Sequence, residues 1–209
     1  MIRKKLPLAG SAWLILLAVT LLAACSEKTT GKIWLLECED DAPESCGYVN
    51  EQGDIMIDFG KYPMCFTDTF EHYAIVVDQD EGIVAINREE EIMYRVFVYD
   101  NGPDYPRDGY FRIIQDKKIG YADVQTGEIS IPPKYTAARP FENNYAPVCP
   151  DCEEVKDGEY SSWVNGKWGL IDKSGKMALP AKYGGISEVS SQGEALVIAD
   201  GEEKWVKIN

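Results

Sequence analysis

The stretch that decides the fold is WGLIDKSG, residues 168–175. Weaker copies begin at Gly47, Gly82 and Gly120 and read GYVNEQG, GIVAINR and GYADVQTG. The glycines, with Gly169 as the last, are separated by 35, 38 and 49 residues (82 − 47, 120 − 82 and 169 − 120). Self-similarity at a spacing of roughly 20–50 residues is typical of repeat proteins. The sequence therefore predicts an array of about four degenerate repeats.

A second phrase precedes the three later copies and recurs once more near the C-terminus. It reads HYAIV at 72–76, GYFRI at 109–113, NYAPV at 144–148 and GEALV at 193–197. Short runs of β-branched and aromatic residues between Gly, Asp and Asn predict strands joined by tight turns. We therefore predict an all-β array of β-meanders, in an open curved sheet or a partial propeller. The segment 31–36 is expected to be an unpaired first strand, and 204–208 to repeat 167–171.

The N-terminal segment 1–24 has the pattern of a secretory signal peptide. Arg3, Lys4 and Lys5 precede a short apolar run, and Leu22-Ala23-Ala24 leads into Cys25. This ending resembles the bacterial lipoprotein box. The resemblance implies a diacylglycerol on the Cys25 sulfur, a further acyl chain such as palmitate on the new amino terminus, and a tether over 25–30.

The predicted location follows from this anchor. Two or three acyl chains, at ~0.8 kcal/mol per buried methylene, hold a protein stably at a membrane. We expect an envelope lipoprotein, on the periplasmic face of the outer membrane in a Gram-negative cell. Removing residues 1–24 leaves 18 basic residues (21 − 3) against 35 acidic ones, a net charge near −17. Such a charge opposes binding to nucleic acid.

The cysteines after Cys25 predict two disulfides. Cys38 and Cys46 flank a short loop, and Cys149 and Cys152 open an inserted loop over about 149–162. Paired cysteines outside the cytoplasm usually form disulfides. A four-cysteine zinc site from the same residues is an alternative, although its first spacing is long for zinc. Cys65 aligns with Ala138 and is expected to be a small buried residue.

Two further residue types could suggest chemistry. His72 is the only histidine, but it aligns with Gly109, Asn144 and Gly193, which predicts a turn rather than a catalytic base. The acidic run 78–82, DQDEG, lacks the third ligand and the distal glutamate of a calcium loop. We therefore predict no catalytic residue, metal or cofactor.

These residues resemble the WG-repeat family, named for the Trp-Gly pair that stands here at Trp168-Gly169. The resemblance covers 31–209, and the copies at Gly120 and Gly169 match best. Cys46, Glu81 and Ile119 replace the tryptophan in the other copies. The resemblance implies a β-rich array in an envelope or secreted protein, and it supplies no catalytic residue.

The leading functional prediction is a non-enzymatic interaction or scaffold module whose partner is an envelope protein. Long loops on rigid scaffolds tend to carry function, so the contact is expected at Asp151, Glu153, Glu154 and Trp163. One alternative is a cell-wall glycan-binding module that uses Trp163, Trp168 and Trp205. A third is a thiol-disulfide enzyme that uses Cys149 and Cys152, although the neighbouring acids oppose thiolate formation.

Overall fold

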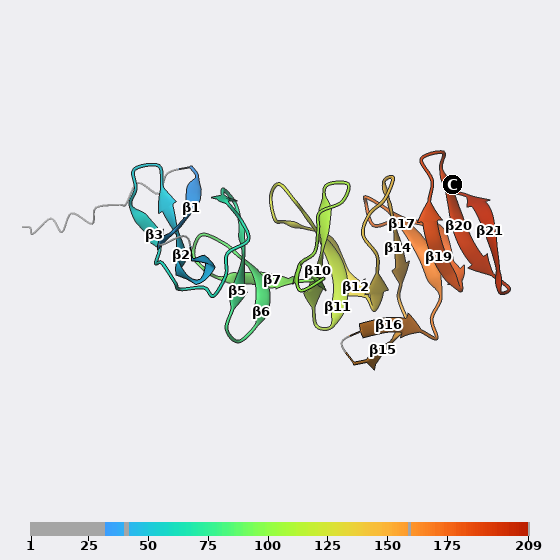
Figure 1. Ribbon diagram of the computed structural model, residues 1–209. Helices are drawn as coiled ribbons and strands as arrows, with labels where there is room; N and C mark the ends of the chain where they lie inside the picture. The colour runs from blue at the N-terminus through green and yellow to red at the C-terminus, as the bar shows by residue number, and fades with distance from the viewer. Residues whose placement is uncertain (1–31, 40–41, 159, 209) are drawn as a thin grey trace, which may run out of the picture. The chain divides into compact units, whose positions relative to one another are not determined.

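The computed structural model describes residues 32–39, 42–158 and 160–208 and consists almost entirely of antiparallel β-strands (Figure 1). It confirms the predicted all-β repeat fold. The predicted signal peptide (1–24), Cys25 and the tether (25–30) lie outside the described residues. Within the described ranges, helical structure is limited to 3-10 turns, such as the one at Pro43–Ser45, and no helix is long and apolar enough to cross a membrane.

The described strands form successive units of antiparallel neighbours, most of which are joined by short turns. Four units have three strands each and a last unit has two. They are β1 (Trp34–Cys38), β2 (Cys46–Asn50) and β3 (Ile55–Ile57); β5 (Ala74–Asp78), β6 (Gly82–Ile86) and β7 (Ile92–Val96); β10 (Tyr110–Gln115), β11 (Lys118–Asp123) and β12 (Ile129–Tyr135); β14 (Tyr145–Cys149), β17 (Trp168–Asp172) and β18 (Met177–Tyr183); β20 (Glu194–Ala199) and β21 (Glu202–Lys207).

Short strands in the connecting segments complete the sheets, which are several and separate rather than one continuous sheet. β4 (Thr69–Phe70) pairs with β1, β13 (Ala137–Ala138) pairs with β14, and β19 (Gly185–Val189) pairs with β20. The second and third units share one sheet because β7 pairs with β10. Two hairpins form sheets of their own: β8 (Val98–Tyr99) with β9 (Gly102–Pro103), and β15 (Glu153–Asp157) with β16 (Tyr160–Val164).

The pairing register repeats from unit to unit. Tyr110 lies opposite Asp123, and Tyr145 lies opposite Asp172. At the N-terminal end, β1 pairs with β2 along its whole length, so the prediction of an unpaired first strand there is wrong. At the C-terminal end, Trp205 lies opposite Leu196 and thus takes the place of Leu170, not that of Trp168.

The second turn of each three-stranded unit is held by an Asp or Asn side chain, as the turn chemistry predicts. The Asp172 Oδ1 accepts hydrogen bonds from the Ser174 and Lys176 amides at 2.9 and 3.1 Å. Asn50 and Asp123 make the equivalent bonds in their units. These bonds satisfy the turn amides and fix where the third strand begins.

The glycines at the signature position are required by a close approach of the third strand. A Cβ on Gly120 would lie 2.5 Å from the Ile131 oxygen, and a Cβ on Gly47 would lie 2.6 Å from the Ile57 oxygen. Gly169 meets the third strand of its own unit in the same way. In the third and fourth units the ladder shifts register next to the glycine. A side chain there would therefore collide with backbone.

Gly82 was predicted to be the same signature residue, and this prediction is wrong. Gly82 occupies the tight turn between β5 and β6, has a φ of +78° and has open space where a Cβ would lie. The register places Val84 at the signature position of this unit. Val84 pairs directly with Arg95 on the third strand, so this unit has no bulge at that point and tolerates a side chain.

His72 lies in a bend before β5, where the alignment with other copies places a turn. Its equivalents Gly109, Asn144 and Gly193 have φ values of +89°, +71° and +77°. His72 is not among the described residues with positive φ, so its backbone is not left-handed.

The core is divided among clusters that mostly join consecutive units. One cluster brings Tyr48 and Ile57 of the first unit together with Val84 of the second. Another joins Tyr121 of the third unit to Val148 of the fourth. Each unit is therefore stabilised chiefly by its neighbours, as expected of a repeat array.

Tyrosines anchor this packing. Tyr62, Tyr135 and Tyr183 are buried, as predicted for packing anchors. The hydroxyls of Tyr48 and Tyr121 donate to the Thr67 and Arg139 carbonyls at 2.8 Å. These bonds tie the second strand of a unit to the segment that leads into the next unit.

Candidate interaction surfaces

The four cysteines predicted to pair form two disulfides, Cys38–Cys46 and Cys149–Cys152. The first joins facing residues of β1 and β2. Because all four sulfurs are in disulfides, the alternative zinc site is wrong.

Cys65 is the free cysteine of the described residues, and it is half-buried. It forms an isolated β-bridge with Val76, just as Ala138 pairs with Val148. This confirms that Cys65 and Ala138 occupy equivalent positions in the repeat. Burial raises the pKa of the Cys65 thiol.

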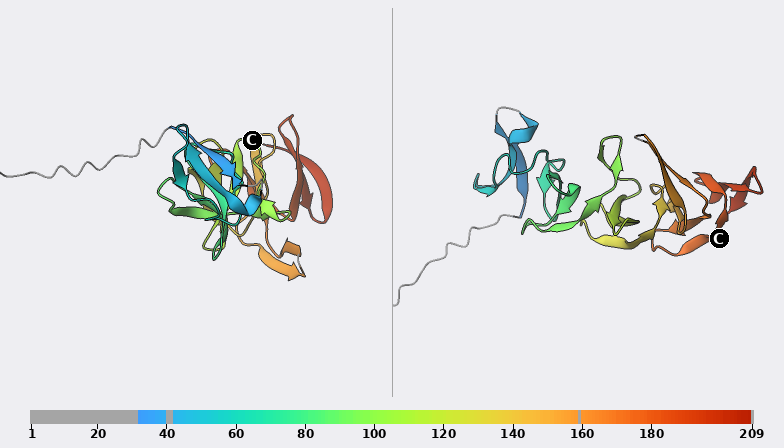
Figure 2. Two further views of the ribbon diagram at one scale, coloured as in Figure 1. Left: turned by 60° about the vertical axis from the view of Figure 1, so that its left-hand side comes forward. Right: turned by 90° about the horizontal axis from the view of Figure 1, so that it is seen from below.

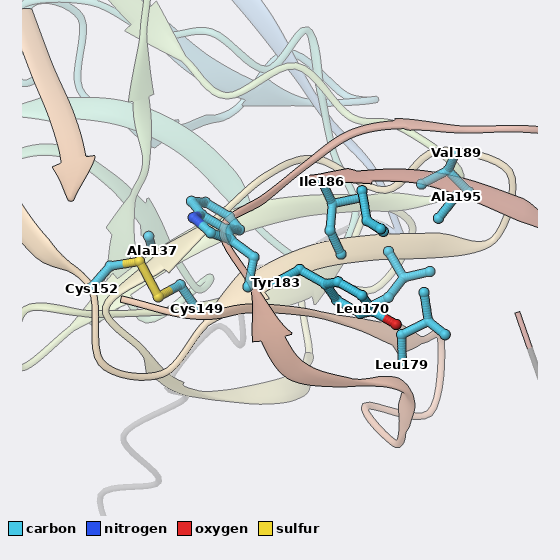
Figure 3. Close-up of a cluster of buried hydrophobic side chains, with 11 residues drawn as sticks. Ala137, Cys149, Cys152, Leu170, Leu179, Tyr183, Ile186, Val189 and Ala195 are labelled. Carbon is cyan, nitrogen blue, oxygen red and sulfur yellow. A yellow bond between two sulfur atoms is a disulfide. The ribbon is translucent and has the colours of Figure 1, made fainter. Parts of the chain in front are cut away.

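The Cys149–Cys152 disulfide lies at one end of a buried cluster that spans the fourth and fifth units (Figure 3). It is packed against the backbone of Gly166, where an added Cβ would lie 2.5 Å from both sulfurs. Asp151 adds a second tie, since its carboxylate accepts from the Lys167 amide at 3.2 Å. The two ends of the inserted segment are thus held together at this disulfide.

The segment between these ends is the hairpin β15–β16, which projects away from the other strands (Figures 1 and 2). Trp163 fixes its orientation. This side chain is partly buried against two core clusters, and its ring centroid lies 6.4 Å from that of Phe97. An isolated two-stranded hairpin is marginally stable in water. The disulfide and Trp163 compensate for that weakness.

The two faces of the hairpin differ. Successive strand residues point to opposite faces, so the register places Glu153, Val155 and Val164 on the face opposite to Trp163. Val155 and Val164 are exposed there. The Glu153 carboxylate accepts from the Asn165 amide group at 3.0 Å. An exposed apolar pair is therefore bordered by fixed negative charge.

The predicted contact residues Asp151, Glu153, Glu154 and Trp163 do come together at this hairpin, the first three exposed and Trp163 half-buried. The tryptophans of the glycan alternative do not form a common exposed face. Trp168 is only 5% exposed and packs below the Arg139 guanidinium, 5.2 Å from its ring. Trp205 is 47% exposed on the last strand. Trp168 has no free face on which a sugar could stack.

A cavity of about 600 Å³ lies where three segments of the array meet. The segment 99–107 contributes Tyr99, Asp104, Tyr105 and Arg107. The connector 139–142 contributes Arg139 to Glu142, and β19 contributes Ser187 to Val189. This volume lies in the range of small-molecule sites, roughly 300–1,000 Å³.

A buried ion pair forms the inner wall of this cavity. Two nitrogens of the Arg112 guanidinium bind the Asp104 carboxylate at 3.0 and 2.5 Å, and a third donates to the Ala138 carbonyl at 3.1 Å. The Arg112 amide also donates to Asp104 at 2.8 Å, and the guanidinium lies 3.9 Å from the centre of the Phe97 ring. These bonds between Arg112 and Asp104 hold the 99–107 segment against β10.

Sequence reasoning missed this pair, although the alignment contained a signal. Arg112 occupies the strand position that holds Ile75, Pro147 and Leu196 in other copies. A charged residue at an apolar repeat position predicts a buried counter-ion nearby.

The cavity also has charged groups without counter-ions. Arg139 donates to the Ile186 carbonyl at 2.8 Å, and burial lowers the pKa of its guanidinium. Among the described residues, neither Arg139, Arg107, Glu142 nor Glu188 forms an ion pair. Within the same ranges, no group of His, Cys, Asp and Glu is placed to hold a metal ion.

A family model described as "WG containing repeat" matches residues 119–149 and 168–201. These ranges correspond to β11 through β14 and to β17 through β20, and the gap between them contains the β15–β16 hairpin. The protein therefore contains WG repeats, as the resemblance implied. None of the curated proteins compared with the chain matches it significantly.

Proposed function

We propose that this WG-repeat protein is a non-enzymatic interaction module of the bacterial cell envelope, held at a membrane by lipid on Cys25, that binds a partner protein through the β15–β16 hairpin. One observation carries the proposal. The hairpin interrupts the repeat and projects from it, and it is fixed by a disulfide, by Gly166 and by Trp163. A rigid projecting element with exposed apolar side chains fits recognition of another molecule.

The surface of the hairpin indicates the chemistry of the partner. Glu153 lies on the same face as the exposed side chains of Val155 and Val164, and Glu154 is exposed on the other face. The β15–β16 sheet has no third strand among the described residues, so its edges offer unpaired backbone groups. A partner segment with basic and apolar side chains, adding to this edge as a strand, would satisfy both features.

The cysteine pair supports a structural role rather than thiol-disulfide exchange. Exchange requires a thiolate to reach one of the sulfurs. Cys149 and Cys152 are 0% and 5% exposed. Glu153 and Glu154 follow directly in the sequence and would oppose thiolate formation after reduction.

The test uses charge reversal on the hairpin. The full chain, Glu153→Lys/Glu154→Lys and a matched control, Asp80→Lys/Glu81→Lys, would each be crosslinked to envelope proteins and purified in detergent. Asp80 and Glu81 lie in the exposed turn between β5 and β6, so the control makes the same charge change away from the hairpin. Mass spectrometry would quantify the captured proteins.

We expect one protein to be enriched by the wild type and by the control, and to fall about tenfold with the hairpin variant, equivalent to about 1.4 kcal/mol. Its capture should also weaken with added salt, since exposed charges are screened. Equal capture by all three proteins would place the contact elsewhere in the array.

A further inference from the structure

The segment 97–109 is the second place where the chain departs from its repeat. It contains the small β8–β9 hairpin and has no equivalent in the other connecting segments. The Arg112–Asp104 pair and the bond from the Asp104 amide to the Phe97 carbonyl, 2.8 Å, hold this segment in place. This fixed segment forms part of the rim of the 600 Å³ cavity. The shape of the rim is therefore determined by specific bonds.

Two exposed tyrosines stand on this segment. Tyr99 and Tyr105 are 53% and 62% exposed, and their rings meet edge to face with centroids 6.1 Å apart. Single exposed aromatics are common on proteins. Here two rings form a corner at the mouth of a cavity, and each keeps most of its surface accessible to a ligand. Such rings combine an apolar face with a polar hydroxyl.

The charges of the side chains that line the cavity add to zero. Arg107 and Arg139 supply N–H donors, and Glu142 and Glu188 supply carboxylate acceptors, while Arg112 and Asp104 neutralise each other. A strongly anionic or cationic ligand would meet a like charge at this rim. A neutral ligand rich in hydroxyls can donate to the carboxylates and accept from the guanidinium groups, and hydrogen bonds to charged groups are the stronger ones.

We propose that this cavity binds a short neutral oligosaccharide, with its sugar rings packed against Tyr99 and Tyr105 and its hydroxyls bonded to Arg107, Arg139, Glu142 and Glu188. Sugar rings present C–H groups on one face and hydroxyls around the edge, which matches aromatic faces bordered by charged donors and acceptors. The cavity shares no lining residue with the β15–β16 hairpin, so this proposed site and the proposed protein contact use different residues.

The test is a titration of the full chain, purified in a detergent without a sugar headgroup. The probes are maltotriose, cellotriose and triacetylchitotriose, followed by isothermal calorimetry and saturation-transfer NMR. Trp168 provides a further readout, because Arg139 lies over its ring and a ligand bound to Arg139 should change its fluorescence. Tyr105→Ala and Arg107→Ala test the cavity. The matched controls are Trp205→Ala and Arg95→Ala, which change exposed residues outside the cavity.

We expect saturable binding of at least one trisaccharide, with a Kd of about 1 mM or tighter. Tyr105→Ala should weaken it about tenfold, as loss of an aromatic contact typically does. The controls and the Glu153→Lys/Glu154→Lys hairpin variant should bind like the wild type. The proposal is overturned by absence of saturable binding of all three trisaccharides at about 10 mM, or by binding that Trp205→Ala alone abolishes.

Discussion

Replacing Gly120 by alanine tests why the repeat keeps its glycine. The new Cβ would lie 2.5 Å from the Ile131 oxygen and 2.6 Å from the Pro133 nitrogen. Ordinary contacts begin at 3.4 Å, so β11 and β12 would have to separate by about 0.9 Å (3.4 − 2.5). Both neighbours are backbone atoms of a paired strand, so no side chain can move aside to make room.

The size of the effect follows from this rigidity. Overpacking a core costs roughly 1–3 kcal/mol, and a clash with backbone places Gly120→Ala at about 3 kcal/mol. For a domain of this size, each kcal/mol lowers Tm by about 2–4 °C, which predicts a drop of about 6–12 °C. Thermal unfolding followed by circular dichroism on the purified protein would measure it.

Two alanine variants complete the series. Gly169→Ala should cost less than Gly120→Ala, because one neighbour of its Cβ is the mobile end of Met177 and the backbone atoms are 2.8 Å away. Gly184→Ala should not destabilise the protein, since its nearest atom is 3.5 Å away. The close-approach argument would be refuted if Gly120→Ala had the same Tm as the wild type. It would also be refuted if Gly184→Ala lowered Tm more than Gly120→Ala does.

Two other predictions concern ionisable groups. After denaturation without reductant, a thiol reagent should titrate one thiol per chain, from Cys65, whereas two would show that Cys25 carries no lipid. Stability should hold up to about pH 9 and fall between pH 10 and 12. Burial raises the pKa of Tyr62 and Tyr73 to about 12, so above pH 10 the unfolded chain loses these protons first and is favoured. Urea midpoints across that range would measure the fall, and a midpoint independent of pH would contradict it.

The strands and both disulfides could be predicted because local patterns determine them. Alternating apolar residues between Asp, Asn and Gly turns define the meanders. The Asp and Asn side chains accept hydrogen bonds from the backbone amides of their own turns. The disulfides followed from cysteines at matching strand ends. In each case the residues that interact lie close together in the sequence.

The signature position of the second unit could not be predicted from the sequence with the same rule. A glycine is required both where φ is positive, as at Gly82, and where another strand approaches closely, as at Gly120. The presence of a glycine in the sequence does not show which of these two reasons applies. Aligning on Val84 makes the first intervals 37 and 36 residues (84 − 47 and 120 − 84), which is more regular than the alignment on Gly82.

The cavity could not be predicted from the sequence for a different reason. Its walls come from three segments separated along the chain, and the counter-ion of Arg112 lies in a loop without a repeat equivalent. Asp104 has no counterpart to align with, so its partner can be found only when β10 and the loop are placed in space. Arg112, a charged residue at an apolar repeat position, indicated where a buried ion pair would lie. It did not indicate that the pair borders a cavity.

Both proposed sites lie where the chain departs from its repeat, and the packing explains why. Within a unit, side chains such as Tyr121 and Val148 are buried against the neighbouring unit and cannot meet a ligand. A new contact surface therefore has to come from added segments, and each added segment needs its own means of staying ordered. The β15–β16 hairpin has the Cys149–Cys152 disulfide, and the 97–109 segment has the Arg112–Asp104 pair. On both proposals the repeat is the rigid support, and the two insertions, together with Arg139, Glu142 and Glu188 of the neighbouring segments, would set binding specificity.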